Sequence, residues 1–130
     1  MLMDGSIKDY VEKVASGAPA PGGGSVAALA GSLGSALTSM VGNLTFGKKV
    51  YEELDDEIQK EMKRNFDELG EIIEKLNHIV DEDTKAFSKV MEAFKLPKET
   101  EEEKAKRSVA IQEGYKIALE VPLRCAEECF

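Results

Sequence analysis

The sequence has few of the residues on which several protein classes depend. It contains no tryptophan, one histidine and two cysteines among 130 residues. Cys125 and Cys129 both lie near the end of the chain, so neither a disulfide framework nor a Cys-x-x-Cys site can be built from them. With so few histidine and thiol ligands, no metal site is expected. A reducing, cytoplasmic setting is therefore the default localisation.

Positive charge is also scarce. Lysine and arginine number 17 against 25 aspartates and glutamates, which gives a net charge of -8. Proteins that bind nucleic acid or anionic membranes present clustered basic side chains to phosphates, so neither partner is expected. The 42% of hydrophobic residues suffices for a packed core. A length of 130 residues is typical of one domain, so we expect a single domain over 1–130.

Charge is absent altogether from Val14 to Gly47, which raises the question of a membrane span. Gly, Ser and Ala dominate this stretch, and large apolar residues are too few for an inserted helix. The basic start and adjoining apolar block of a signal peptide are lacking too. Small residues instead recur at every fourth position: Ala27, Gly31, Ser35 and Ser39. This spacing predicts a buried helix over about 25–46 that its neighbours approach closely.

Helical periodicity extends over most of the remaining chain. Apolar residues repeat at helical spacing over about 51–95, which predicts one long helix or two collinear segments. Capping boxes at Ser6–Asp9 and Thr100–Glu103 open two further helices, and Pro122 marks a kink or a fresh start. No segment alternates as a strand does. We therefore predict an all-α bundle in which the central apolar helix, about 25–46, is surrounded by the others.

A loop rich in proline and glycine precedes the uncharged helix, for which Ser25 is the expected N-cap and Gly47 the expected end. Two nucleotide-binding signatures fit its glycine spacing but fail on context. The dinucleotide pattern needs a preceding strand, and the phosphate loop needs Lys followed by Ser or Thr. Glycines before a helix can present backbone N–H groups to an anion or a flat polar ligand. A tight connection between two helices is the alternative, and both stay open here.

One position on the apolar stripe is a carboxylate. The helical spacing from Val80 to Phe87 passes through Asp83. Burial raises the pKa of a carboxyl group, as acid–base catalysis near neutral pH requires, and the nearby Asp81 would raise it further by like-charge repulsion. Alternatively, Asp83 faces solvent or pairs with a lysine. The residue types alone do not choose between a catalytic and a structural role.

Several segments together resemble the formiminotetrahydrofolate cyclodeaminase and methenyltetrahydrofolate cyclohydrolase family. The resemblance spans almost the whole chain in the family's order. It rests on Pro19–Ala28, Ser39–Gly42, Thr45–Lys49, Val80–Phe87, Leu96–Thr100, Gln112–Gly114 and Val121–Leu123.

The resemblance implies a helical fold, a homodimer and a tetrahydrofolate derivative as substrate, with no further cofactor. Family domains continue through additional helices, so we expect this domain to lack its C-terminal helices. The cyclodeaminases close N10 of the folate onto the formimino carbon at N5 and release ammonia, whereas the cyclohydrolases add water to the methenyl carbon and open the ring. Both reactions pass through a tetrahedral carbon flanked by nitrogens, which a proton-exchanging carboxylate would serve.

The resemblance also implies roles for particular residues. Asp83 is the expected acid–base residue, with Asp81 as a tuning or second carboxylate. The substrate-binding residues expected are Pro21, Gly22, Gly23, Gly24 and Ser25, through backbone donors, and Lys48 and Lys49, which would meet the glutamate tail of the folate. The alternatives are a folate-binding domain without turnover and a helical dimerisation module.

Overall fold

The computed structural model describes residues 1–130, and all of its regular structure is helical. A short 3-10 helix precedes five α-helices, and no strand is present. The elements are η1 (Leu2–Asp4), α1 (Ile7–Ala15), α2 (Gly23–Thr45), α3 (Lys49–Glu52), α4 (Asp56–Phe94) and α5 (Glu101–Cys129). The prediction of an all-α helical bundle is confirmed.

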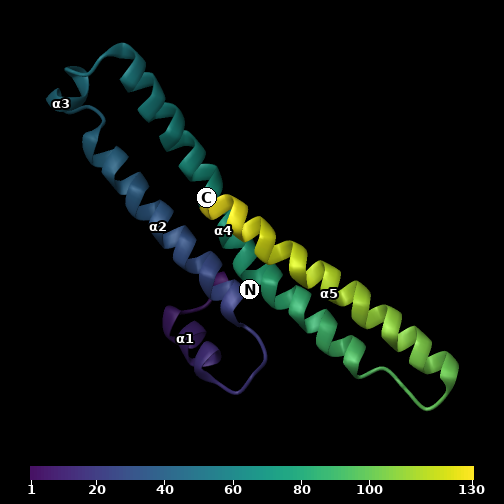
Figure 1. The fold of residues 1–130 in the computed structure, drawn as a ribbon. Helices are drawn as coiled ribbons and strands as arrows, with labels where there is room; N and C mark the ends of the chain where they lie inside the picture. Colours follow the sequence, from purple (N-terminus) through teal and green to yellow (C-terminus); the bar gives the residue numbers. More distant parts are fainter.

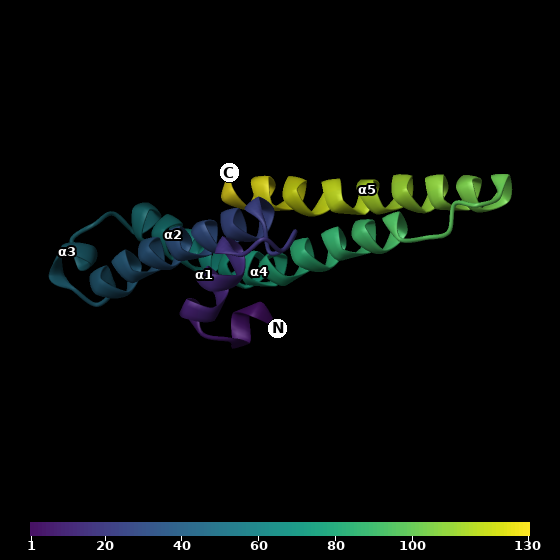
Figure 2. The ribbon, with the colours of Figure 1, turned by 90° about the horizontal axis from the view of Figure 1, so that it is seen from below.

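The 39-residue helix α4 is the element to which the rest of the chain attaches. Figure 1 shows α2 running beside its first half and α5 beside its second half, with α1 near its middle. The same arrangement is visible from below in Figure 2. The buried core lies where these elements meet, and its members are Tyr10, Ala28, Leu76, Ile79, Val80, Ala86, Val121 and Cys125. The site described below lies at this junction.

Helix α2 approaches α4 closely through small residues, as its composition predicts, but in a different register. Its buried residues are Ser25, Ala28 and Ser32, whereas the predicted Ala27 is exposed. A side chain at Gly31 would meet Leu76. The opposite side of α2 is open, because α4 covers only one side of it. Its exposed large residues are Val26, Leu33, Leu37, Met40, Val41 and Leu44.

By length and composition alone, α2 is a helix that could cross a membrane, and 17% of its most apolar window is buried. A helix that packs inside a protein assembly passes the same test. The sequence argument against a membrane span therefore rests on the small size of the many Gly and Ser side chains, and not on a low overall hydropathy. Whatever covers α2 meets a surface without charge.

Two helix boundaries differ from the prediction. Ser25 is not the N-cap of α2, because the helix begins at Gly23 and Gly22 is its N-cap, without a side-chain hydrogen bond. Pro122 does not start a new helix but lies inside the continuous α5. The buried Val121 and Cys125 on either side of it hold α5 in the core, and this packing offsets the backbone hydrogen bond that a proline removes.

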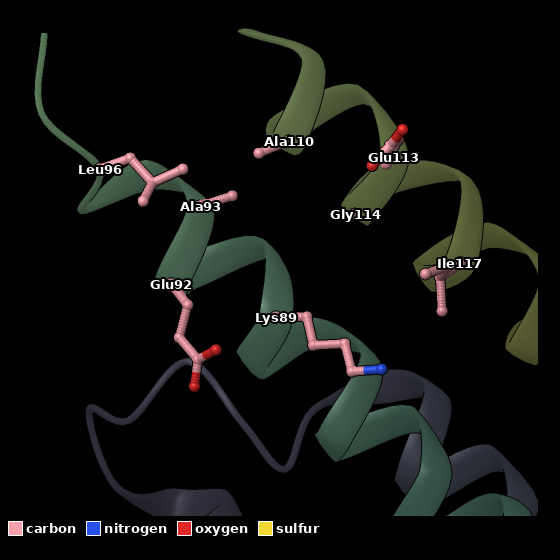
Figure 3. Close-up of a pocket in the computed structure, with 8 residues that line it drawn as sticks. All are labelled: Lys89, Glu92, Ala93, Leu96, Ala110, Glu113, Gly114 and Ile117. Carbon is pink, nitrogen blue, oxygen red and sulfur yellow. The ribbon is translucent and has the colours of Figure 1, made fainter. Parts of the chain in front are cut away.

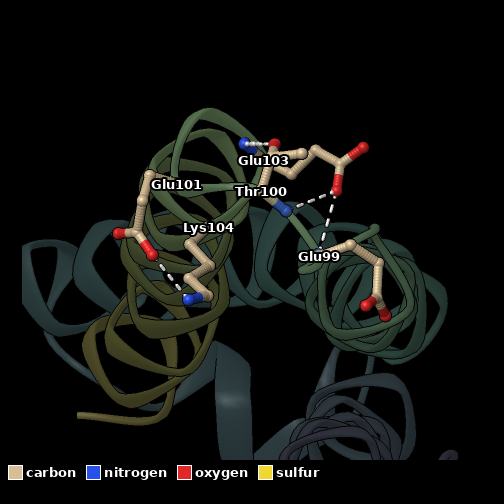
Figure 4. A network of polar contacts seen from close by, with 5 residues as sticks. All are labelled: Glu99, Thr100, Glu101, Glu103 and Lys104. Atoms are coloured by element: carbon tan, nitrogen blue, oxygen red, sulfur yellow. Dashed lines mark hydrogen bonds and ion pairs between the residues drawn. The ribbon is translucent and has the colours of Figure 1, made fainter.

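Other termini follow the predicted chemistry. Ser6 caps α1 by accepting a hydrogen bond from the Asp9 backbone N–H, and Gly47, just beyond α2, has a φ of 73°. The capping box of α5 is complete: Thr100 Oγ1 accepts from the Glu103 N–H at 3.1 Å, while the Glu103 carboxylate accepts from the Thr100 N–H at 3.1 Å (Figure 4). The long helix predicted over 51–95 begins at Asp56, because the chain breaks after the short α3.

Candidate active site

The Asp83 carboxylate of α4 lies directly on the backbone of the first turn of α2. A Cβ atom added to Gly24 would stand less than 3.0 Å from three atoms of this carboxylate. Real Cβ atoms essentially never approach so closely. The absence of a side chain at Gly24 is therefore a condition of the contact. The structure thus brings together the glycine loop and the one carboxylate that interrupts the apolar stripe.

Burial changes the acidity of Asp83. Loss of contact with water raises the pKa of its carboxyl group, and a backbone hydrogen bond from Ser25 lowers it, the first effect being the larger. Asp83 also lies near the core thiol of Cys125. The pKa of that thiol is raised to about 11 by burial, then by the neighbouring Cys129, and also by the charge of Asp83. The carboxylate that the helical spacing places on the apolar stripe is thus partly buried, and burial is the larger influence on its pKa.

The first turn of α2 offers backbone donors beside Asp83. The first four N–H groups of a helix have no acceptor within the helix. The Gly22 N-cap has no side chain to bond them, the Ser25 N–H donates to the Asp83 carboxylate, and the Val26 N–H is the first to bond within the helix, to the Gly22 carbonyl at 3.1 Å. Pro21 is buried, and the space around an added Cβ at Gly23 is open. A ligand can therefore approach the loop at Gly23 without displacing protein atoms.

A buried pair of hydroxyl groups lies beneath this turn. Ser25 is 0% exposed, and its Oγ donates to the Val80 carbonyl at 2.8 Å. The Tyr10 hydroxyl lies 2.8 Å from the same Oγ. Because a serine hydroxyl has one proton, Tyr10 is the donor in this second bond. Sequence reasoning missed Tyr10; its signal was a polar tip on the apolar face of α1.

Asp81 has a different partner from the one expected. It is 7% exposed, and its Oδ1 accepts a hydrogen bond of 2.6 Å from the Leu2 backbone N–H. Two residues along an α-helix point to nearly opposite sides, so Asp81 and Asp83 diverge. Asp81 is not among the groups that shift the pKa of Asp83. The structure gives it the role of anchoring η1 to α4.

The structure does not bring Lys48 and Lys49 to the glycine loop. Both are exposed and lie beyond the far end of α2, whose 23 residues span roughly 35 Å. Lys49 pairs with Glu53 at 3.5 Å. The two lysines follow the loop within one stretch of sequence, but an extended helix separates them in space. Within one copy of the chain they cannot contact a ligand at Gly23 that is shorter than this helix.

A groove lies apart from Asp83, between the C-terminal half of α4 and α5. This groove has a volume of about 300 Å³ and is lined by Lys89, Glu92, Ala93, Leu96, Ala110, Glu113, Gly114 and Ile117. Figure 3 shows Ala93 of α4, and Leu96 just after the end of that helix, on the side of the groove opposite α5. It contains no member of the Gly24–Asp83 contact. No group of three or more His, Cys, Asp or Glu side chains is placed to hold a metal ion.

Comparisons with known proteins match nearly the whole chain. The mouse formimidoyltransferase-cyclodeaminase is 43% identical over 126 residues, which cover 97% of this chain and 23% of that protein. The methenyltetrahydrofolate cyclohydrolase of Methylorubrum extorquens is 43% identical over 124 residues, covering 95% of this chain and 58% of that protein. The crystal structure of formiminotetrahydrofolate cyclodeaminase from Thermotoga maritima has a TM-score of 0.77 at 32% identity, covering 98% of this chain and 58% of that one.

The chain thus spans less than two thirds of the length of each of these relatives. The family model described as formiminotransferase-cyclodeaminase matches residues 6–130. This match includes both the glycine loop and the Asp83 segment of α4. The chain therefore belongs to the formiminotransferase-cyclodeaminase family.

Proposed function

We propose that this chain acts on the one-carbon unit of a tetrahydrofolate derivative, as a 5-formiminotetrahydrofolate cyclodeaminase or a 5,10-methenyltetrahydrofolate cyclohydrolase. The names of its relatives support both reactions. The observation that carries the proposal is the Asp83 carboxylate, which is half-buried against Gly24 and next to the N–H groups of Gly23 and Gly24, which have no acceptor within α2. The proposed chemistry is proton transfer and calls for no cofactor beyond the folate.

A carboxyl group with a raised pKa suits both reactions. It retains its proton at a higher pH than an ordinary aspartate, so it can give that proton to nitrogen, and it can then accept one from water or nitrogen. In ring closure, N10 bonds to the formimino carbon and loses its proton, the leaving nitrogen takes up protons, and its bond to that carbon breaks as ammonia departs. In ring opening, water bonds to the methenyl carbon and loses both protons as the formyl group forms, while one ring nitrogen takes up a proton as its bond to that carbon breaks.

The glycine loop would hold the polar edge of the folate. Gly23 is open to solvent, and Gly22–Ser25 carry the backbone N–H groups that lack acceptors within α2. A Cβ added at Gly23 meets no protein atom within 4 Å, so we expect a valine there to obstruct the ligand without moving Asp83. We expect Gly23→Val to weaken folate binding, measured by tetrahydrofolate fluorescence or calorimetry. Unchanged affinity would make the loop only a connection between helices.

The acid–base assignment is tested by two matched substitutions. We expect the wild-type chain to accelerate loss of the 5,10-methenyltetrahydrofolate absorbance, and Asp83→Asn to reduce this rate by about 10²- to 10⁴-fold. Asp81→Asn keeps an oxygen acceptor for the Leu2 N–H and should retain most of the activity. Full turnover in Asp83→Asn would overturn the assignment.

An assay with the second substrate distinguishes the two reactions. If the methenyl compound is unaffected, ammonia release from 5-formiminotetrahydrofolate identifies a cyclodeaminase. If the wild-type chain binds tetrahydrofolate but transforms neither substrate, it is the folate-binding module of the alternative hypothesis. If it binds none of these folates, the helical dimerisation module is favoured and the enzymatic proposal is wrong.

We also propose that the chain works as a homodimer in the cytoplasm. The open, uncharged side of α2 supports the first part, since six large apolar side chains are exposed there and such patches mark interaction surfaces. The two free thiols fit a reducing compartment. The test of the oligomeric state is given in the Discussion.

A further inference from the structure

The two buried hydroxyls of Tyr10 and Ser25 join three helices at one point. Tyr10 comes from α1, Ser25 from α2, and their acceptor, the Val80 carbonyl, from α4. Both side chains are buried, at 7% and 0% exposure. A buried hydroxyl that loses its partner is costly, so such a chain of bonds holds its members in one arrangement.

This linkage lies next to the Asp83 contact. Val80 precedes Asp83 by three residues on α4, and Ser25 follows Gly24 directly on α2. The linkage therefore fixes the height and rotation of the first turn of α2 close to the carboxylate. A further side-chain hydrogen bond between α2 and α4, from Ser32 to Asn77, lies about two turns further along α2.

The ionisable group that bonds to this turn is the Asp83 carboxylate itself, which accepts from the Ser25 N–H. Helix α2 carries no ionisable side chain, and its N-cap makes no side-chain hydrogen bond. We propose that Tyr10 and Ser25 are positioning residues for Asp83, whose linked hydroxyls hold the first turn of α2 on α4 so that Gly24 closes over the carboxylate. Where turnover is concerned, the inference rests on the proposed function. The positioning itself can be measured without a substrate.

Few ionisable groups surround Asp83. The Cys125 thiol of α5 is close enough to interact with the charge of Asp83, and α1 contributes the Tyr10 hydroxyl. Helix α2 contributes no ionisable side chain. Of its neighbours on α4, Glu82 pairs with Arg124 of α5 and Lys85 is exposed. Burial is the larger influence on the Asp83 carboxyl group. The titration of the Asp83 carboxyl group therefore reports how tightly α2 packs against it, because water that reaches the carboxyl group lowers its pKa toward the ordinary range.

The experiment follows the side-chain carboxyl carbon of Asp83 by NMR as a function of pH, in the substrate-free chain labelled with ¹³C-aspartate. The Asp83→Asn spectrum assigns the signal. We expect both Tyr10→Phe and Ser25→Ala to lower the midpoint by about half a pH unit or more, within the usual spread of carboxyl pKa values. The double variant should shift no further than Ser25→Ala, because Tyr10 acts through Ser25.

Each variant has a matched control. Tyr51→Phe removes a hydroxyl that donates to the Gln59 carbonyl at the far end of α4, and Ser88→Ala removes one that donates to the Thr84 carbonyl on the same helix as Asp83. Both should leave the Asp83 midpoint unchanged. The loss of a hydroxyl bond to a carbonyl elsewhere in the chain would change the controls too, so it cannot by itself imitate the expected pattern.

An unchanged Asp83 midpoint in folded Tyr10→Phe and Ser25→Ala overturns the inference. If circular dichroism shows that Ser25→Ala does not fold, Tyr10→Phe decides alone, because it keeps the buried ring. In the active enzyme, the pH profile of turnover should move in the same direction as the NMR midpoint, with a fall in kcat of about 10-fold. Should the midpoint move while the wild-type chain lacks turnover, the positioning role stands and the proposed function fails.

Discussion

A glycine and a carboxylate form the contact on which the site depends. At Gly24 an added Cβ would overlap the Asp83 carboxylate, whereas at Gly34, also in α2, it would meet nothing within 4 Å. We expect Gly24→Ala to displace the carboxylate and reduce turnover by about 100-fold, as a misplacement of about 1 Å can do. The measurement is kcat with each folate substrate.

Gly34→Ala is the control for this prediction. It should leave turnover unchanged and stabilise the helix by about 0.5 to 1 kcal/mol, since alanine favours a helix over glycine. Equal activity of Gly24→Ala and Gly34→Ala would show that the Asp83 contact has no part in the chemistry.

The buried carboxyl group also makes stability depend on pH. Its folded-state pKa is raised above the ordinary 3.8, so its contribution to folding is fully present below pH 3.8 and is lost as the pH rises through the folded-state pKa. Asp83→Asn removes the charge and keeps an oxygen for the Ser25 N–H. Thermal unfolding should show the variant more stable than wild type at pH 7, with the difference shrinking as the pH falls through the folded-state pKa and reaching its minimum below pH 3.8. A constant difference at all pH values would contradict this.

At the residue scale, sequence periodicity found Asp83 but not its surroundings. A carboxylate on an apolar stripe is visible in the spacing, and so is a glycine-rich loop before a helix. The Tyr10–Ser25 bond was not predictable, because it depends on how α1 packs beneath α2. Asp81 was misjudged for a related reason: closeness in sequence suggested mutual repulsion, while the helix turns the two carboxylates apart.

Among the elements, α4 and α5 meet through another glycine. A Cβ at Gly114 would lie 3.3 Å from Val90 Cγ2, whereas one at Gly70, on α4, would meet nothing within 4 Å. We expect Gly114→Val to force the two helices apart and lower the free energy of unfolding by about 1 to 3 kcal/mol. Gly70→Ala should raise it by about 0.5 to 1 kcal/mol. Urea denaturation measures both free energies. An unchanged free energy of unfolding in Gly114→Val would show that α4 and α5 do not pack closely at this glycine.

Element by element, helix existence was easier to predict than helix termini. Capping at Ser6 and Thr100 uses local side-chain chemistry, which a sequence displays. Ser25 satisfies the same local preference, but tertiary hydrogen bonds to Tyr10 and Val80 use its hydroxyl instead. Pro122 was expected to interrupt α5, and burial on both sides of it prevailed over that local cost.

For the whole molecule, the open side of α2 predicts self-association. Leu37 of α2 and Leu119 of α5 are equally exposed, at 62% and 61%. We expect sedimentation velocity to show a wild-type dimer that Leu37→Lys converts to a monomer, because a charge is costly in an apolar interface. Leu119→Lys should remain dimeric. A monomeric wild type would refute the proposal that a second copy of the chain covers this side of α2. Flotation of the chain with lipid vesicles would then identify a membrane as what covers it.

The composition of α2 was sufficient to predict that it has apolar surroundings, but not which element supplies them. Helix α4 covers one side, and the remaining side is open within this chain. Periodicity identifies the face that avoids water and is silent on whether the partner belongs to the same molecule. For this reason the helical class could be predicted, whereas the prediction that other helices surround α2 does not hold within a single copy, where one side of α2 is exposed.

The attachment of α2 and α5 to opposite halves of α4 has a consequence for local unfolding. Each half of α4 loses its cover when its partner helix detaches, whereas the middle is held by both partners and by α1 (Figure 1). Amide hydrogen exchange should therefore be slowest around Leu76 to Val90 and faster toward both ends of α4. Asp83 lies within this segment, so the carboxylate of the proposed site is carried by the part of the helix that should open least often.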